Sequence, residues 1–373
     1  MWKKMLCCLL AGLMLLSCAA CGGKTPAEPQ NQEPVVTPEP TENTDPAENT
    51  DPAENTEPVV EPDPEPVVVN PLSGLPLADP EMVNARPVAV MLNNHRSAQP
   101  QHGISDADIL YEFLVECGIT RLMGVFQEPA QAGTIGSVRS ARACYIETVK
   151  GLDAIYAHCG SSPEGRQMMP NLGIDRIDGA AYEGTVYWRD MDRYKTMAWE
   201  HILMTSGENI SNFLAKSSMR RNHNEGYEYP ITYVEDATPV NGEDAAHISV
   251  RFSSYKTGVF DYDPETGLYM VSQYGAPHVD GNTGKQLGTT NVLVLRTSVV
   301  NSGDSYGHMN IDLQGTGSGT FFCGGKAESI TWSKKTVSDP FTYYHADGTP
   351  LSLQAGHSYV CVIPLSADMT YGA

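Results

Sequence analysis

The sequence predicts an α/β N-terminal domain followed by a mostly antiparallel β C-terminal domain, both after a disordered, acidic, Pro-rich stalk. Three observations carry this prediction: a polar repeat before residue 70, strand patterns mixed with helix signals up to about residue 225, and short β-rich segments after it. The predicted boundaries are 1–21 for a leader, 22–70 for the stalk, 71–225 for the α/β domain and 226–373 for the β-rich domain.

The first residues are typical of an exported protein. Trp2-Lys3-Lys4 makes a short positive start, and residues 5–16 form an almost unbroken apolar run. That run is too short to span a bilayer as an ordinary helix, and its flanks match a secretory signal peptide. Small residues and cysteines follow, an arrangement that resembles the lipobox of bacterial lipoproteins, in which one cysteine is acylated.

Two cysteines satisfy this lipobox pattern. Cys21 follows Ala19-Ala20 and precedes Gly22-Gly23, whereas Cys18 has leucine three positions before it and serine directly before it. We favour Cys21 as the lipidated residue and keep Cys18 as the alternative. A soluble secreted protein, cut at an Ala-x-Ala site, is the third interpretation. Several acyl chains would hold the chain firmly on the extracytoplasmic face of the cell membrane.

The segment from Lys24 to Asn70 has the composition of a disordered stalk. It contains twelve acidic residues, one lysine and no aromatic residue, and the hexapeptide at 42–47 recurs at 48–53. A repeat this polar cannot bury enough apolar surface to offset the entropy lost on ordering. The stalk is either a spacer that lifts the body from the lipid surface or a tether of no particular length.

The charge and cysteine content of the remaining body exclude several classes of protein. The body carries 33 acidic and 21 basic residues, which argues against nucleic acid and anionic lipid head groups as partners. Its five cysteines are odd in number and widely spaced, without a Cys-x-x-Cys pair. They therefore predict neither a disulfide framework nor a structural zinc site, and most are expected in the core. We expect no cofactor and no metal.

Residues up to about 225 mix strand and helix signals. Strands are predicted at 86–92, 109–116, 119–127 and 153–158, with a hairpin turn at Cys117-Gly118. Ser137 has the position of an N-cap for a helix that ends at Gly151, because glycine commonly follows the last helical turn. The capping-box pattern at 205–208 predicts a second helix that reaches about Lys216.

After the charged stretch 219–228, short β-rich segments dominate. They cover 248–252, 259–262, 268–272, 291–300, 319–323 and 359–364. The residues at 263–267 form a turn pattern between two of these segments. Residues from about 230 onward therefore predict a mostly antiparallel β domain, either a sheet or a sandwich.

Motifs spread over most of the body suggest a family. The N-terminal half contains NPLSGLP from Asn70, RPVAVMLNNH from Arg86, ADILYE from Ala107, GITR from Gly118, GSVRSAR from Gly136 and WRD from Trp188; the second half contains His278-Val279-Asp280, Thr283-Gly284, Gln286-Leu287 and Asn291-Val292. In this order they resemble the YerB-like family of bacterial lipoproteins over nearly all of 70–373. The resemblance implies two domains of unknown function on a lipid-anchored protein, and it brings no established activity or catalytic residue. The chain departs from the family pattern at Ser137, where proline is usual, and at Ile202, where asparagine is usual.

Two arginines are the first candidates for a ligand site. Arg139 and Arg142 lie three residues apart on the first turns of the predicted helix, so they share a face and oppose the helix dipole. One interpretation is a bound phosphate or carboxylate, held by both guanidiniums and by free amides around Ser137. The alternative is a set of structural salt bridges with carboxylates of the preceding hairpin, namely Asp108, Glu112 or Glu116.

Glu112 and Glu116 are candidates for a general acid–base pair. If the hairpin turn has two residues, both carboxylates share one face of the sheet with Arg121, among Leu110, Leu114 and Met123. Unpaired buried carboxylates are costly, so Arg121 is the expected partner, and structural pairing is the favoured interpretation.

Polar residues at strand and loop ends mark the face to search. His95, His158 and His201 lie at such ends, and strand ends are where α/β domains bind ligands. We place Asn94, His95 and Asp190 with the arginines in the candidate ligand-binding face, and His158 and His201 among the catalytic candidates. Each histidine on its own is expected to be structural.

Three further patterns carry less weight. A hydrolase using Ser161, a histidine and Asp190 lacks the Gly-x-Ser-x-Gly nucleophile elbow. His278 and Asp280 lie on one side of a strand and are a weak metal signal. The glycine-rich run 315–319 precedes a β segment rather than a helix, so it predicts a turn and not a nucleotide loop.

The leading interpretation is a non-enzymatic envelope lipoprotein that binds an anionic wall component or a partner protein through its α/β domain. The alternative is an envelope enzyme, a hydrolase or transferase on a wall polymer, with Glu112 or Glu116 as acid–base and the arginines holding an anion. A purely scaffolding role of the β-rich domain is the third interpretation.

Overall fold

The computed structural model describes residues 67–373. The predicted leader, both lipobox cysteines (Cys18 and Cys21) and residues 22–66 of the predicted stalk lie outside the described residues. The last stalk residues belong to the folded body: Asn70 is buried and donates from Nδ2 to Oδ1 of Asp108 (2.7 Å). Within the described part of the chain, no helix combines the length and apolarity needed to cross a membrane.

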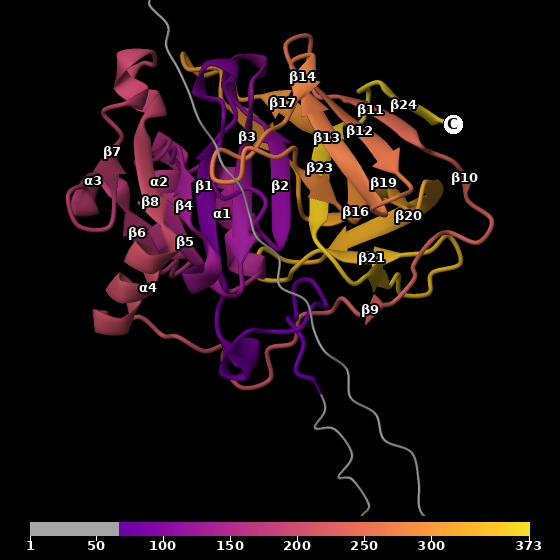
Figure 1. Cartoon of the computed structure of the whole chain (residues 1–373), viewed down its shortest axis with the longest axis horizontal. Helices are drawn as coiled ribbons and strands as arrows, with labels where there is room; N and C mark the ends of the chain where they lie inside the picture. The colour runs from indigo at the N-terminus through magenta and orange to yellow at the C-terminus, as the bar shows by residue number, and fades with distance from the viewer. Residues whose placement is uncertain (1–66) are drawn as a thin grey trace, which may run out of the picture. The chain divides into compact units, whose positions relative to one another are not determined.

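Helices occupy only the first half of the described chain. The α-helices are α1 (Ala143–Gly151), α2 (Pro163–Asn171), α3 (Gly179–Tyr182) and α4 (Gly207–Lys216). The 3-10 helices are η1 (Pro80–Asn84), η2 (Arg96–Ala98), η3 (Glu116–Gly118), η4 (Pro129–Gln131), η5 (Arg193–Lys195) and η6 (Trp199–His201). All four α-helices lie beside the indigo and magenta strands in Figure 1, and the orange and yellow half is made of strands.

Strands run through the whole described chain. The first half contains β1 (Val88–Asn93), β2 (Ile109–Leu114), β3 (Thr120–Phe126), β4 (Thr134–Gly136), β5 (Ile155–His158), β6 (Arg176–Asp178), β7 (Trp188–Arg189) and β8 (Leu203–Ser206). The second half contains β9 (Tyr233–Val234), β10 (Glu243–Asp244), β11 (His247–Arg251), β12 (Thr257–Asp263), β13 (Leu268–Gln273), β14 (Ala276–Pro277), β15 (Gly288–Thr289), β16 (Asn291–Thr297), β17 (Val299–Asn301), β18 (Met309–Ile311), β19 (Gly315–Cys323), β20 (Lys326–Lys334), β21 (Thr342–Tyr344), β22 (Leu353–Gln354), β23 (Ser358–Pro364) and β24 (Met369–Gly372). The predicted fold class, α/β followed by mostly antiparallel β, is confirmed.

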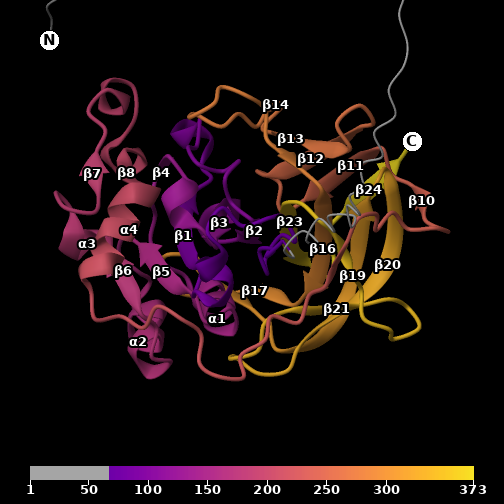
Figure 2. The same cartoon turned by 60° about the horizontal axis from the view of Figure 1, so that its bottom comes forward.

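One large mixed sheet joins the two halves. Its main path is β10-β20-β19-β16-β23-β2-β3-β1-β5-β6, and β21 pairs with β20. The late strand β23 is parallel to both β2 and β16, so the strands of the two halves meet where β23 pairs with β2 in the middle of the sheet. Figure 2 shows this arrangement from below, with β2 beside β23 and β16.

Both faces of the large sheet are covered. On one face, Val90 and Leu110 share a core with Ile248 and Phe260 of a second sheet, whose path is β14-β13-β12-β11-β24. On the other face, neighbouring strand residues pack against Tyr145 and the rest of α1. Because successive side chains of a strand point to opposite faces, a strand buried on both sides is an unbroken apolar run. This explains why residues 86–92 lack alternation.

The predicted hairpin of β2 and β3 is present, but its predicted register is wrong. The loop between the strands is the three-residue η3, and Arg121 lies opposite Phe113. A two-residue turn would have placed Arg121 opposite Leu114. Since side chains alternate along a strand, this shift of one residue turns Arg121 to the face opposite Glu112. The three charged side chains therefore do not share one face.

The predicted start of the first helix at Ser137 is also wrong. Residues 137–141 are extended, and their backbone groups bond neighbouring strands: Val138 N to Leu203 O (2.7 Å), Arg139 N to Met91 O (2.9 Å) and Cys159 N to Arg139 O (3.0 Å). α1 begins only at Ala143, and its end at Gly151 is as predicted. Local capping patterns are weak compared with such tertiary hydrogen bonds, which explains the error. The second helix, α4, is present as predicted, but its N-cap is Ser206, whose side chain accepts from Asn209 N, one residue later than the capping box that begins at Thr205.

Candidate functional site

The candidate site lies where three parallel strands end. β1, β5 and β6 are parallel and end at Asn93, His158 and Asp178. Only the first three residues of β1 pair with β5, and the extended residues 137–141 lie between the last part of β1 and the chain that follows β5. The carboxyl ends of parallel strands, at a point where neighbouring strands diverge, commonly bind ligands in α/β folds.

Three guanidinium groups gather around one carboxylate at this edge. Glu116 accepts from Arg121 Nη2 (2.5 Å), and Arg142 binds both of its oxygens, with Nη2 at 2.6 Å and Nε at 2.9 Å. Arg121 also donates to the backbone oxygen of Ser140. The sequence analysis gave a salt bridge to Glu116 as one alternative to a bound anion at Arg142. The structure has this salt bridge, and Arg121 joins it.

Burial and the neighbouring charges shift the pKa values within this cluster. Burial alone would raise the pKa of Glu116, but Arg121 and Arg142 lower it to about 2. Burial, followed by repulsion from Arg142, lowers the pKa of Arg121 to about 9, although Glu116 acts in the opposite direction. At neutral pH the cluster therefore carries one negative charge and an excess of positive charge.

Arg139 is the cation of this cluster that has no carboxylate partner. Its Nη1 donates to the backbone oxygen of Glu200 (3.1 Å), and no Asp or Glu oxygen lies within 4 Å of the guanidinium among residues 67–373. Arg139 is only half-buried, and burial lowers its pKa. A guanidinium has five N–H donors, so this single bond leaves most of them available for an anion.

Two histidine rings lie next to this guanidinium. His95 and His201 stack at 5.3 Å between centroids and 9° between planes. The Asn93 side chain holds them both, since its Nδ2 bonds Nδ1 of His201 (2.8 Å) and its Oδ1 accepts from His95 N (3.0 Å). Burial, and then the charge of Arg139, lower the pKa of His201.

Two residues of this group were absent from the sequence prediction. Asn93 stands at the same strand end as Asn94 and His95, so its position was a usable signal. Tyr255 stacks on His95 at 6.0 Å but comes from the second half of the chain, and nothing in the sequence joins it to His95.

The structure places Glu112 and Asn94 away from this surface. Both are fully buried, and Asn94 donates from Nδ2 to Oε1 of Glu112 (2.9 Å). Tyr359 donates to the other carboxylate oxygen (2.6 Å), and Lys256 Nζ lies 3.0 Å from Oε1. The expected neighbours Leu110 and Leu114 share this face, whereas Met123 lies on the other. With every oxygen engaged, this geometry favours the structural interpretation of Glu112 over general acid–base catalysis.

Three other predicted residues have structural surroundings. His158 is fully buried, bonds the Gly160 carbonyl through Nδ1 (2.8 Å), and has its pKa lowered by burial. Asp190 accepts from Arg193 N (3.1 Å) and caps a turn. Ser137 is buried, and Val138, the next residue, already donates its amide to a strand carbonyl, so the predicted amide cradle is wrong.

His278 and Asp280, the weak metal signal, bond a loop instead. Nε2 of His278 contacts Oε1 of Gln101 (2.9 Å), and Asp280 accepts from the amides of Gly103 (3.3 Å) and Ser105 (2.8 Å). Within residues 67–373, no group of three or more His, Cys, Asp or Glu side chains is arranged to hold a metal ion.

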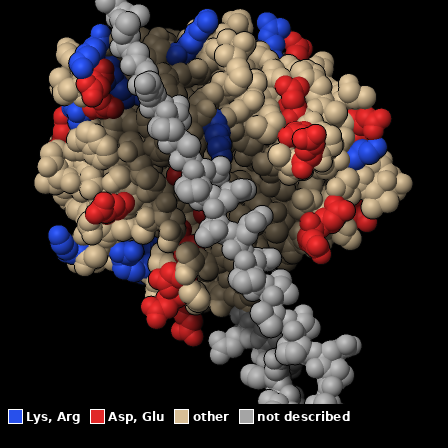
Figure 3. Space-filling model, viewed as in Figure 1, with Lys and Arg blue, Asp and Glu red and all other residues tan. Residues whose placement is uncertain are grey.

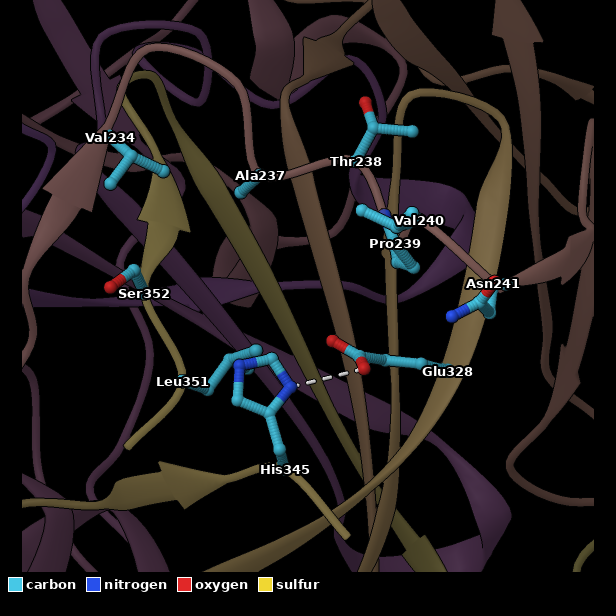
Figure 4. A pocket seen from close by; sticks show the side chains of 11 residues that line it. Val234, Ala237, Thr238, Pro239, Val240, Asn241, Glu328, His345, Leu351 and Ser352 are labelled. Carbon is cyan, nitrogen blue, oxygen red and sulfur yellow. Dashed lines mark hydrogen bonds and ion pairs between the residues drawn. The ribbon is translucent and has the colours of Figure 1, made fainter. Parts of the chain in front are cut away.

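The larger pockets lie outside the arginine cluster. Figure 4 shows one of about 420 Å³ in the β-rich half, where His345 pairs with Glu328 (3.1 Å) among apolar side chains. It contains none of the predicted site residues. Another pocket, of about 410 Å³, is lined by Tyr255, Ser272 and Tyr274 and lies beside the histidine pair through Tyr255. On the face seen in Figure 3, Lys and Arg are scattered among Asp and Glu rather than gathered into one basic patch.

Comparisons with known proteins agree with the motifs in the sequence. A protein family of unknown function, DUF3048, matches with its N-terminal domain at residues 72–220 and with its C-terminal domain at 248–360. A protein of Bacillus subtilis (strain 168) named "Putative lipoprotein YerB" is 29% identical over 308 residues, which cover 81% of this chain and 88% of the relative. A crystal structure of the YerB protein from Bacillus subtilis superposes with a TM-score of 0.70 and 26% identity, over 81% of this chain and 99% of that chain. The chain therefore belongs to the YerB-like family, whose N- and C-terminal DUF3048 domains have no established function.

Proposed function

We propose that this chain is a lipoprotein held by Cys21 on the extracytoplasmic face of the cell membrane, and that its folded body binds an anionic group. The anion belongs to a cell-wall component or to an envelope partner protein. The leader and lipobox pattern and the similarity to a protein named as a lipoprotein support the anchor. Cys18 is the alternative anchor.

The observation that carries the binding proposal is the charge balance at the end of β1. Arg121 and Arg142 form ion pairs with Glu116, whereas Arg139 forms no ion pair within 4 Å among the described residues and is attracted only at longer range by the Glu200 and Glu116 carboxylates. Partly buried charges are costly unless they are compensated, so a guanidinium without a direct ion pair favours an external anion. The imidazole of His95, which stacks on His201 and is held by Asn93, adds a further polar group.

The overall charge of the body limits how the anion is held. With 33 acidic and 21 basic residues, the body does not attract anions over long distances. Binding therefore depends on close contacts at Arg139, and long-range attraction does not accelerate association. A bound polymer would bring several such contacts together on one surface.

An enzymatic function receives less support from the geometry. Both carboxylates proposed as acid or base are occupied by cations, and the pKa of Glu116 of about 2 keeps it ionised at neutral pH. A general acid needs a pKa near the working pH.

The anion site is tested by thermal unfolding of the full chain purified in detergent, with sulfate, phosphate or chloride at matched ionic strength. We expect phosphate and sulfate to raise the Tm more than chloride, because a ligand that binds only the folded state stabilises it. Arg139→Gln is expected to abolish this increment.

Arg296→Gln is the matched control. Arg296 is also half-buried and also donates to backbone carbonyls (Ala367 O, 2.8 Å), but no second guanidinium accompanies it. This variant is expected to keep the full increase in Tm caused by sulfate and phosphate. Part of that increase can come from exclusion of sulfate from the protein surface, an effect that both variants share. Equal increments in the two variants, or no increment in the unmodified chain, would falsify the proposal.

A further inference from the structure

We infer that the ligand of the Arg139 site is an anionic sugar polymer, whose acidic group binds Arg139 while neighbouring uncharged sugar units lie on aromatic side chains. This inference rests on the proposed function and names the class of its ligand. It comes from the surroundings of Arg139 in both halves of the chain.

A row of four rings leads away from the cation. His201 stacks on His95, His95 stacks on Tyr255 at 6.0 Å, and Tyr255 meets Tyr274 edge-to-face at 5.7 Å. Exposure rises along the first part of the row, from 7% for His201 to 41% for Tyr255. The row therefore continues the anion site outward onto the second half of the chain.

The row ends at an uncharged pocket. Tyr255 and Tyr274 line this pocket of about 410 Å³ together with Thr257 and Ser272, and none of its lining residues carries a charge. Such a pocket suits a neutral, hydroxyl-rich group rather than a second anion. The pocket would therefore bind the neutral part of the ligand, while Arg139 would bind the acidic part.

A second pair of exposed rings lies on the other flank. Arg139 donates to the backbone carbonyl of Glu200, which directly follows Trp199. The Trp199 side chain is 49% exposed and packs edge-to-face on Tyr194, with 5.5 Å between ring centroids. The guanidinium of Arg189 lies 4.6 Å over the Trp199 ring and fixes its orientation. An exposed pair of rings with a fixed orientation offers a flat apolar surface on which a ligand can lie.

This arrangement favours sugars over other anionic chains. A sugar ring has an apolar face for an aromatic ring and a hydroxyl rim for Thr257 and Ser272. Polyphosphate and nucleic acid carry a charge on every unit, and each would place an anion against an uncharged lining. The cation beside this lining, Lys256, lies 5.6 Å from the Tyr274 ring centroid and is already paired with Glu112. A sugar polymer with acidic groups on only some of its units matches a cation at one end of the ring row and an uncharged pocket at the other.

The experiment measures binding to the full chain in detergent by calorimetry. The probes are lightly phosphorylated dextran, lightly carboxymethylated dextran, unmodified dextran, polyphosphate, a single-stranded oligonucleotide and inorganic phosphate. We expect at least one modified dextran to bind about tenfold more tightly than the other four probes, because ring stacking and ion pairing act together. The two modified dextrans distinguish phosphate from carboxylate as the acidic group.

Variants separate the rings from the cation. Tyr255→Ala and Trp199→Ala are expected to weaken binding of the modified dextran about tenfold and to leave the increase in Tm caused by phosphate unchanged. Arg139→Gln is expected to abolish both the dextran binding and the increase in Tm. Tyr255→Phe retains the ring and should bind like the unmodified chain. Tyr344→Ala removes a tyrosine that lines a different pocket, together with Pro230 and Lys335, and should have no effect.

The outcomes distinguish this inference from the proposed function. If phosphate raises the Tm through Arg139 but the modified dextrans bind no more tightly than phosphate, polyphosphate or the oligonucleotide, the sugar-polymer inference is overturned and the anion site stands. The same holds if the ring variants bind modified dextran unchanged. If no anion affects the chain and Arg139→Gln changes nothing, both are overturned.

Discussion

Lys256 Nζ lies 3.0 Å from Oε1 of Glu112, and the two side chains are 1% and 0% exposed. Glu112 belongs to the N-terminal family domain and Lys256 to the C-terminal one. The pair lies between the large sheet and the second sheet, where Glu112 projects from β2 among apolar residues. This buried ion pair links the two family domains at the centre of the molecule.

Removing one partner of this pair is expected to destabilise the protein strongly. Lys256→Met should lower the free energy of unfolding by about 3–5 kcal/mol, because it leaves a buried carboxylate without its cation. Urea denaturation measures the loss, and adding Glu112→Leu to the same chain should recover part of it. Lys326→Met, which removes an exposed pair with Asp244, is the control and should cost less than about 1 kcal/mol. Similar losses for the two lysines would contradict the prediction.

The stability of the protein should fall below pH ~4.5 because of Glu116. Its folded-state pKa of about 2 lies below the ordinary value of 4.5, so the ionised carboxylate stabilises the fold above pH ~4.5 and this contribution is lost as the pH falls toward about 2. The shift corresponds to about 3 kcal/mol. Denaturation midpoints measured from pH 7 to pH 2.5 should show the loss. A Glu116→Gln chain should be less stable at neutral pH and change less with acid; an unchanged pH slope would count against this role.

Asp280 is expected to hold the loop that follows β1. Its carboxylate accepts from the amides of Gly103, Ser105 and Asn282, and it is fully buried. Asp280→Ala leaves these donors unsatisfied and should cost about 2–3 kcal/mol. Hydrogen exchange should show lost protection at Gly103 and Ser105. Asp261→Ala, which removes an exposed partner of His247, should leave the exchange of that loop unchanged. Retained protection in the Asp280 variant would refute this role.

Cys21 is expected to carry the lipid. Cys21→Ser should release the chain from sedimented membranes and abolish labelling with a fatty acid, because the acyl chains supply nearly all of the membrane affinity. Cys18→Ser should remain lipidated and membrane-bound. The reverse pattern in the two variants would assign the anchor to Cys18.

The sequence predicted part of the candidate site because some of its residues stand at strand ends. His95 and His201 are such residues, and the structure brings them together with Arg139, which was predicted from a helix start that the structure does not have. The register of the hairpin could not be predicted, because the sequence between the strands is compatible with a loop of two or of three residues. The two loop lengths place Arg121 on opposite faces of the sheet. Tyr255 could not be predicted either, because its contact with His95 joins residues 160 positions apart.

By itself, the sequence determined the fold class, the family and most of the strands of five or more residues. These follow from local patterns of apolar, charged and turn residues, which act over a few positions along the chain. Only the tertiary structure decided that residues 137–141 are extended and that Glu112 pairs with Lys256 while Arg139 keeps no acidic partner among the described residues. Hydrogen bonds and ion pairs between distant segments form when the sheets assemble, and they outweigh local helix preferences of less than about 1 kcal/mol per residue.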